Sequence, residues 1–130
     1  MSSYPKEYLY SEDHEWIRVE EEIAVLGITE FAQTELGEVV FVELPETGQV
    51  FDAGDEIGTI ESVKAVAELY TPVAGEIVEV NESVADDPDV LNDDPHGDGW
   101  LVKVRFSSSG DLEDLMDAEA YGDFVEGEGA

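Results

Sequence analysis

Lys64 is the residue with the most distinctive chemical setting in this chain. The sequence contains 5 Lys and Arg side chains against 34 Asp and Glu, and Lys64 is the only cationic side chain between Arg18 and Lys103. A lysine ε-amine is a compact, modifiable group, and it is the usual point for joining a carboxylic cofactor through an amide. Two interpretations follow: a cofactor attachment point, or an ordinary solvated lysine that pairs with Glu61 or Glu68.

Other reactive groups are scarce. The absence of cysteine excludes disulfides, thiolate metal sites and cysteine nucleophiles. No Gly-x-Ser-x-Gly motif or phosphate-binding glycine loop accompanies the two histidines, His14 and His96. Asp94, His96 and Asp98 resemble the first half of a calcium loop, but Arg105 occupies the position of the bidentate glutamate. We therefore expect neither a metal site nor an enzyme.

The net charge of −29 limits the classes of partner. Nucleic acids and anionic membranes are bound through Lys and Arg, so neither is expected. Repulsion among so many acids opposes compaction, unless salt shortens the screening length to about 3 Å, as at roughly 1 M. The composition predicts a high-salt cytosol, as in a halophile; an acidic interaction protein at ordinary salt is the alternative. No apolar run reaches membrane-spanning length, and residues 1–5 do not form a signal peptide, so we expect a cytoplasmic protein.

The hydrophobic pattern predicts one mainly β domain over residues 1–130. A hairpin is expected from 15–19 and 22–27, followed by a short helix over 30–36 that Thr29 caps and Gly37 ends. Further strands are expected at 39–44, 56–60, 65–70, 76–80 and 100–106. The pattern then becomes helical, which predicts a C-terminal helix over about 110–125 and a frayed tail over 126–130.

The segment around Lys64 is ambiguous by pattern alone. Residues 61–69 fit either two strands joined by a turn or one to two turns of helix. No Gly, Pro, Asn or Asp marks a bend at the lysine. The pattern leaves both structures open.

Several short motifs occur in a fixed order along the chain. In order, they are His14-Glu15-Trp16, Gly27-Ile28-Thr29-Glu30-Phe31-Ala32-Gln33 with Leu36-Gly37, Val39-Val40-Phe41-Val42-Glu43-Leu44-Pro45 with Gly48, Glu61-Ser62-Val63-Lys64-Ala65, Pro72 with Gly75, and Asn92, Pro95, Gly99 and Trp100. Over nearly the whole chain, this set resembles the glycine cleavage system H-protein family.

The resemblance implies a fold and a cofactor. The fold is a mainly β barrel-sandwich hybrid of the lipoyl and biotinyl type, with a short internal helix, a C-terminal helix and the lysine on a hairpin. The cofactor is (R)-lipoate, joined to Lys64 by an amide. Glu61, Ser62, Val63 and Ala65 form the context in which the attaching enzyme recognises the lysine.

The resemblance also implies a function and partners. The protein is expected to be a monomeric, non-catalytic carrier. It takes an aminomethyl group from the P protein, a glycine decarboxylase, to the T protein, an aminomethyltransferase, and the L protein, a dihydrolipoyl dehydrogenase, reoxidises it. A lipoate-attaching enzyme is the remaining partner. In this family the loaded arm docks into a cleft, and Glu15, Glu68 and Asp13 are the acids expected to receive its cationic amine. Glu35 and His96 depart from the family pattern, which has histidine in some relatives at the first position and often an aromatic residue at the second.

Three other carriers remain as alternatives. A biotin carrier is disfavoured because Val63 and Ala65, rather than methionines, flank Lys64. A lipoyl domain of a 2-oxo-acid dehydrogenase complex normally lacks the blocks at residues 14–16 and 99–100. A family member that serves as a lipoyl relay donor, or one that is never modified, would have the same lysine, so the sequence separates neither from a glycine cleavage carrier.

Overall fold

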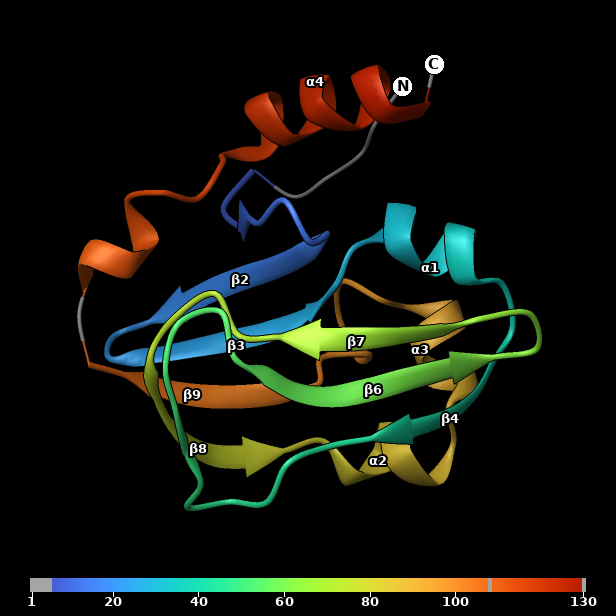
Figure 1. Ribbon diagram of the computed structural model, residues 1–130, viewed down its shortest axis with the longest axis horizontal. Helices are drawn as coiled ribbons and strands as arrows, with labels where there is room; N and C mark the ends of the chain where they lie inside the picture. Colours follow the sequence, from blue (N-terminus) through green and yellow to red (C-terminus); the bar gives the residue numbers. More distant parts are fainter. Residues whose placement is uncertain (1–5, 108, 130) are drawn as a thin grey trace.

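Two antiparallel β-sheets form the body of the molecule (Figure 1). The computed structural model describes residues 6–107 and 109–129. The larger sheet contains, in spatial order, β1 (Leu9–Tyr10), β2 (Glu15–Glu20), β3 (Ile23–Ile28), β9 (Val102–Phe106), β8 (Gly75–Val80) and β5 (Val50–Phe51). The smaller sheet contains β4 (Val39–Glu43), β6 (Glu56–Ser62) and β7 (Val66–Tyr70). Among the described residues, β7 pairs with β6 alone, so its outer edge is open.

Short helices surround the sheets. They are α1 (Glu30–Leu36), α2 (Glu82–Asp86), α3 (Asp89–Asp93), the 3-10 turn η1 (Ser109–Leu112) and α4 (Ala118–Gly129). In Figure 1, α1 lies beside the open edge of β7, and α4 lies over β1 and β2. No helix in the described part of the chain is both long and apolar enough to cross a membrane.

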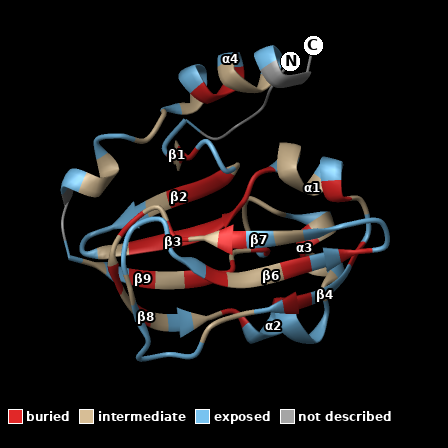
Figure 2. Ribbon diagram, viewed as in Figure 1, coloured by how far each residue is buried: buried red, intermediate tan, exposed pale blue. Residues whose placement is uncertain are grey.

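The two sheets share one main core. It includes Ile17, Leu26 and Val104 of the larger sheet with Ile60 and Leu69 of the smaller. A second cluster lies on the other face of β2 and β3, under α4. Its buried members are Tyr8, Tyr10, Trp16, Val25 and Tyr121. Both faces of these strands are therefore covered, which explains the nearly continuous burial of β3 (Figure 2).

The structure confirms the fold class predicted from the sequence, with the two sheets forming a sandwich that does not close into a barrel. The first hairpin is present, and Glu21 adopts a positive φ of 58° in its turn. Thr29 caps α1 by accepting a hydrogen bond from the Ala32 amide at 3.3 Å. Gly37 ends α1 with a φ of 80°, a backbone region that favours glycine.

The C-terminal segment differs from the single helix expected over about 110–125. Met116 exchanges two backbone hydrogen bonds of 2.8 Å with Tyr10, so this stretch pairs with β1 and cannot be helical. Asp117 then accepts a hydrogen bond from the Ala120 amide at 2.8 Å, and α4 begins at Ala118. The helix continues to Gly129, through most of the segment expected to fray, while Ala130 lies outside the described residues.

The acidic segment between β8 and β9 contains α2 and α3, two short helices that are not among the elements expected from the hydrophobic pattern. Asn81 caps α2 through its side chain, which accepts a hydrogen bond from the Ser83 amide at 3.2 Å. Pro88 stands immediately before α3. Asparagine and proline are both common at helix starts, so the beginnings of these two helices have local sequence signals.

Candidate functional site

Lys64 lies at the tip of the β6–β7 hairpin, where its side chain is exposed. The Ser62 amide donates to the Ala65 carbonyl at 2.8 Å and closes the turn. The Ser62 hydroxyl accepts hydrogen bonds from the Lys64 and Ala65 amides at 3.3 and 3.1 Å. A serine that satisfies two turn amides replaces the Gly, Asn or Asp expected at a bend. Residues 61–69, which by pattern fit either a helix or two strands joined by a turn, therefore form a hairpin.

The turn between α1 and β4 supports the tip of this hairpin. The Val63 amide donates to the Glu38 carbonyl at 3.0 Å. Asn92 of α3 donates to the Gly37 carbonyl at 2.7 Å and accepts from the Val39 amide at 2.9 Å. A Cβ atom at Gly37 would lie 3.4 Å from the Lys64 Cε, so the lysine side chain passes directly over this glycine. Lys64 therefore projects from a hairpin whose turn is held in place by hydrogen bonds to the neighbouring α1–β4 turn.

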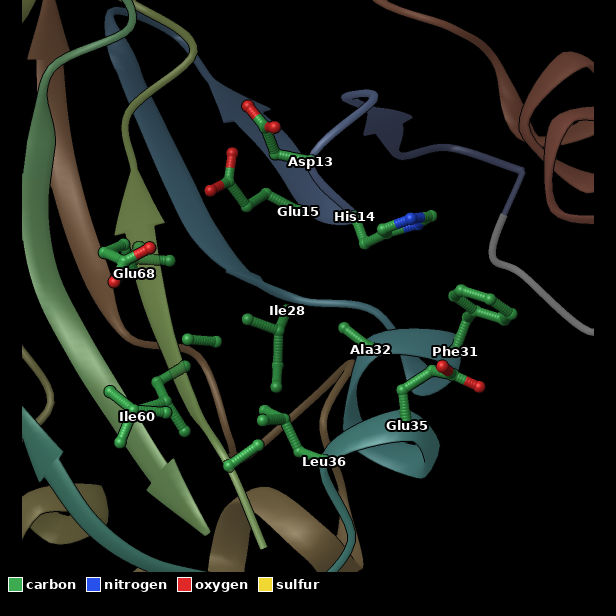
Figure 3. A pocket seen from close by; sticks show the side chains of 14 residues that line it. Asp13, His14, Glu15, Ile28, Phe31, Ala32, Glu35, Leu36, Ile60 and Glu68 are labelled. Carbon is green, nitrogen blue, oxygen red and sulfur yellow. The ribbon is translucent and has the colours of Figure 1, made fainter. Parts of the chain in front are cut away.

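A cleft of about 360 Å³ extends from the hairpin along the open edge of β7 (Figure 3). β7 forms one wall, α1 forms the other, and the start of β2 closes the far end. Its apolar lining includes Ile28, Ala32, Leu36, Ile60, Ala67 and Leu69. Four acids also line the cleft: Asp13, Glu15, Glu35 and Glu68. This lining suits an apolar chain that ends in a cation.

Glu15 is the buried acid of the cleft, with a relative exposure of 2%. Its Oε2 accepts from the Tyr70 amide at 2.8 Å, and its Oε1 accepts from the Ser11 hydroxyl at 3.1 Å. Burial raises the pKa of Glu15 to about 8; the negative charge of Asp13 adds to this rise, while the bonds from Tyr70 and Ser11 oppose it. At neutral pH the carboxyl is therefore mostly protonated.

The other three acids of the cleft lie on different walls. Glu68 is exposed on β7, and its Oε1 accepts from the Tyr70 hydroxyl at 3.4 Å. Asp13 stands beside Glu15 in the turn before β2, and Glu35 stands on the α1 wall (Figure 3). The structure thus brings together all three acids expected to dock a cationic arm, and it adds Glu35, which the sequence had marked only as a departure from the family pattern.

A hydrogen-bonded chain connects α4 to the cleft. The Tyr121 hydroxyl lies 2.8 Å from the Nδ1 of His14 and 2.7 Å from the hydroxyl of Thr29, the cap of α1. His14 has a positive φ of 66°, and its ring contacts Phe31 of α1 with the ring centroids 4.7 Å apart. Since His14 and Phe31 line the cleft, α4 fixes the position of the α1 wall. Sequence spacing gave no signal for this contact, because Tyr121 is 92 residues from Thr29.

Removing the Tyr121 hydroxyl is expected to destabilise the protein by about 1–3 kcal/mol, because two buried or half-buried partners lose a hydrogen bond. Urea unfolding of Tyr121→Phe measures this change. Tyr70→Phe is the matched control, because the Tyr70 hydroxyl bonds to Glu68 at a solvent-exposed position. Equal free energies of unfolding for the two variants would show that the Tyr121 chain contributes no stability.

His96 supports α1 from outside the cleft. Its Nε2 accepts a hydrogen bond from the Glu30 amide in the first turn of α1, at 3.0 Å. Burial lowers the pKa of His96, against the opposing charges of Glu30 and Asp94, and this favours the neutral ring that can accept. Among the described residues, no group of three or more His, Asp or Glu side chains is placed to hold a metal ion.

Comparison with known proteins identifies the family to which this chain is similar. The family model described as "Glycine cleavage H-protein" matches residues 8–128. The chain is 53% identical over 124 residues to a glycine cleavage system H protein of Synechococcus sp. (strain JA-3-3Ab), covering 95% of this chain and 96% of the relative. It is 49% identical over 129 residues to that of Carboxydothermus hydrogenoformans, with 99% of each chain covered. The crystal structure of a glycine cleavage system H protein from Mycobacterium marinum aligns with a TM-score of 0.89 and 37% identity, over 95% of this chain and 99% of the other.

Proposed function

We propose roles for the site residues on one premise: this chain belongs to the glycine cleavage H-protein family. It is a non-catalytic lipoyl carrier of the glycine cleavage system, and its partners are the P, T and L proteins and the lipoate-attaching enzyme. When bound to Lys64, lipoate would supply a disulfide that is reduced as it takes up the aminomethyl group from the P protein; transfer of that group to the T protein would leave a dithiol, which the L protein would reoxidise to the disulfide. We also propose that residues 1–130 form a single carrier domain that acts as a monomer.

Lys64 is the residue to which lipoate is joined. The observation that carries this proposal is its place: it is exposed at the tip of a braced hairpin, at the mouth of an apolar cleft lined by acids. An attaching enzyme can reach the amine there, and an attached acyl chain has a groove beside it. The turn bonds of Ser62 hold the lysine backbone in this presentation, while Glu61, Val63 and Ala65 complete the recognition context.

The test is the mass of the native protein. A lipoyl-sized increment is expected on the intact chain, and peptide mapping is expected to place it on the fragment that contains Lys64. An increment on Lys6 or Lys103 would contradict the assignment, as would an unmodified protein from cells that lipoylate other carriers.

The cleft is proposed to hold the cationic end of the cargo. Burial raises the pKa of Glu15 and favours its protonated form, whereas an ammonium group beside its carboxyl would favour the ionised form, so Glu15 releases its proton to solvent as the cation enters. Asp13 and Glu68 face the same space and add negative charge. The apolar walls exclude water from the labile aminomethyl group.

The acidic composition is proposed to serve a high-salt cytoplasm. Added KCl is expected to raise the thermal midpoint, because salt screens the repulsion within a chain of net charge −29. A gain of a few kcal/mol corresponds to a rise on the order of 10 °C in a domain of this size. The measurement is a thermal melt across a KCl series, with a neutral osmolyte at equal osmolality as control. A midpoint that does not rise with KCl would contradict the high-salt assignment.

A further inference from the structure

Apolar side chains are concentrated on the surface next to Lys64. Six large apolar side chains are exposed among the described residues, and four lie on or beside the lysine hairpin: Val40, Phe41, Val63 and Val66. We call these four residues the hairpin patch. The other two, Val19 and Val50, belong to the larger sheet.

Strand register places the patch on the outer face of the smaller sheet. Phe41 is opposite Glu61, and Glu61 is opposite Val66, so these three side chains form one row across β4, β6 and β7. The next row, Val42 and Ile60, is buried in the core on the opposite face. The row of Phe41, Glu61 and Val66 lies at the end of β6 that leads into the Lys64 turn.

A β-bulge adds Val40 to this row. The register of β4 shifts between Val39 and Phe41, so Val40 and Phe41 are consecutive residues that are both exposed, at 48% and 52%. In a regular strand one of the two would face the core. Bulges re-aim side chains in this way and are common next to functional sites. Asn92 fixes the neighbouring turn by its bond to the Val39 amide, so the patch is held in a rigid position.

We propose that the hairpin patch is the docking surface for the lipoate-attaching enzyme. The inference rests on attachment at Lys64 and names the surface that this partner covers. Before attachment, the reacting amine is only one side chain away from the backbone, so the enzyme must bring its active site against the hairpin and the surface beside it. The P, T and L proteins act on the far end of the acyl arm, so their reactions do not require contact with this face.

The border of the patch defines the chemistry of the partner surface. Glu38, Glu43 and Glu61 are exposed around the apolar side chains, so the complementary surface is apolar with Lys or Arg at its rim. At high ionic strength the charge attraction is screened, whereas apolar burial is retained. Four exposed apolar residues suit a small, transient interface in which a few anchors supply most of the affinity.

The test compares single variants of the unmodified protein as substrates for the lipoate-attaching enzyme. Val40→Thr and Phe41→Thr keep residues that favour strands and lie outside the cleft lining. Val50→Thr is the matched control, because Val50 is 73% exposed on β5 of the other sheet. Thermal melts of all three report whether each variant is folded.

The expected result is a loss of about tenfold in kcat/KM for attachment in Val40→Thr and Phe41→Thr, carried mainly by KM. Direct titration of the unmodified protein with the attaching enzyme is expected to show a similar rise in Kd. Val50→Thr is expected to match the wild type in both measurements. Patch variants driven to full lipoylation by excess enzyme are expected to support the P-protein reaction normally.

Two results would overturn the docking inference alone: patch variants that are lipoylated and bound like the wild type, or fully lipoylated patch variants that fail only with the P protein. A variant that melts early is replaced by Val40→Ala or Phe41→Ala, which remove apolar atoms at the same two exposed positions outside the cleft lining. If the wild type itself takes up no lipoyl group at Lys64, the attachment proposal fails, and the docking inference fails with it.

Discussion

Replacement of Lys64 by arginine is expected to abolish lipoate attachment completely while leaving the protein folded. The guanidinium keeps the positive charge and the long apolar stem, but it remains protonated and does not form the amide. The exposed position of Lys64 predicts little change in stability, within about 0.5 kcal/mol. Intact mass after incubation with the lipoate-attaching enzyme measures attachment, and glycine-dependent exchange of carbon dioxide by the P protein measures function.

The matched control is Lys103→Arg, because Lys103 lies on β9 and approaches Glu79 at 3.5 Å, outside the cleft lining. It should be lipoylated and active like the wild type. A lipoyl increment that persists in Lys64→Arg would place the cofactor on another residue, and the assignment of the hairpin would then be wrong.

Replacement of Glu15 by glutamine is expected to remove a large pH dependence of stability. The pKa of Glu15 in the folded protein is about 8, against an ordinary value of 4.5, so the folded state binds more protons than the unfolded state between these values. The contribution of Glu15 is therefore fully present below about pH 4.5 and is lost as the pH rises through about 8. Between pH 5 and 9 the free energy of unfolding of the wild type should fall relative to Glu15→Gln by an amount on the order of a few kcal/mol.

Urea unfolding at several pH values measures this difference. Glu68→Gln is the control, because it removes one carboxylate from the same cleft at an exposed position. Its pH profile should parallel that of the wild type, since the repulsion among the other acids is nearly unchanged. Parallel profiles for the wild type and Glu15→Gln would show that Glu15 does not hold its proton when the protein is folded.

The same variant tests the proposed role of the cleft. An ammonium group in the cleft should be held less well by Glu15→Gln, because an amide does not ionise in response to it. The aminomethyl cargo should then be lost to water faster than in the wild type, as measured by the release of formaldehyde from the loaded protein. An unchanged rate of loss would indicate that Glu15 serves the fold and not the cargo.

Several parts of the fold were predictable because their signals are local. Thr29 and Gly37 define the two ends of α1 by their own hydrogen bonding and backbone freedom. A strand was expected at 100–106, and β9 forms over Val102–Phe106; its alternating residues place Val102 and Val104 in the core and Arg105 at the surface. The C-terminal helix was misplaced because its local pattern competed with a distant partner: Tyr10 takes both backbone bonds of Met116.

By itself, the sequence determined the candidate attachment residue, the family resemblance and most of the strands, because residue type, motif order and alternation are properties of neighbouring residues. Only the tertiary structure decided what surrounds Lys64. It buries Glu15 against the Tyr70 amide, 55 residues away, and thereby raises the pKa of its carboxyl. It also connects Tyr121 to Thr29 and turns Phe41 outward beside the lysine. Burial and its effect on charge depend on groups that are distant in sequence, so chain packing alone creates the cleft and the docking face.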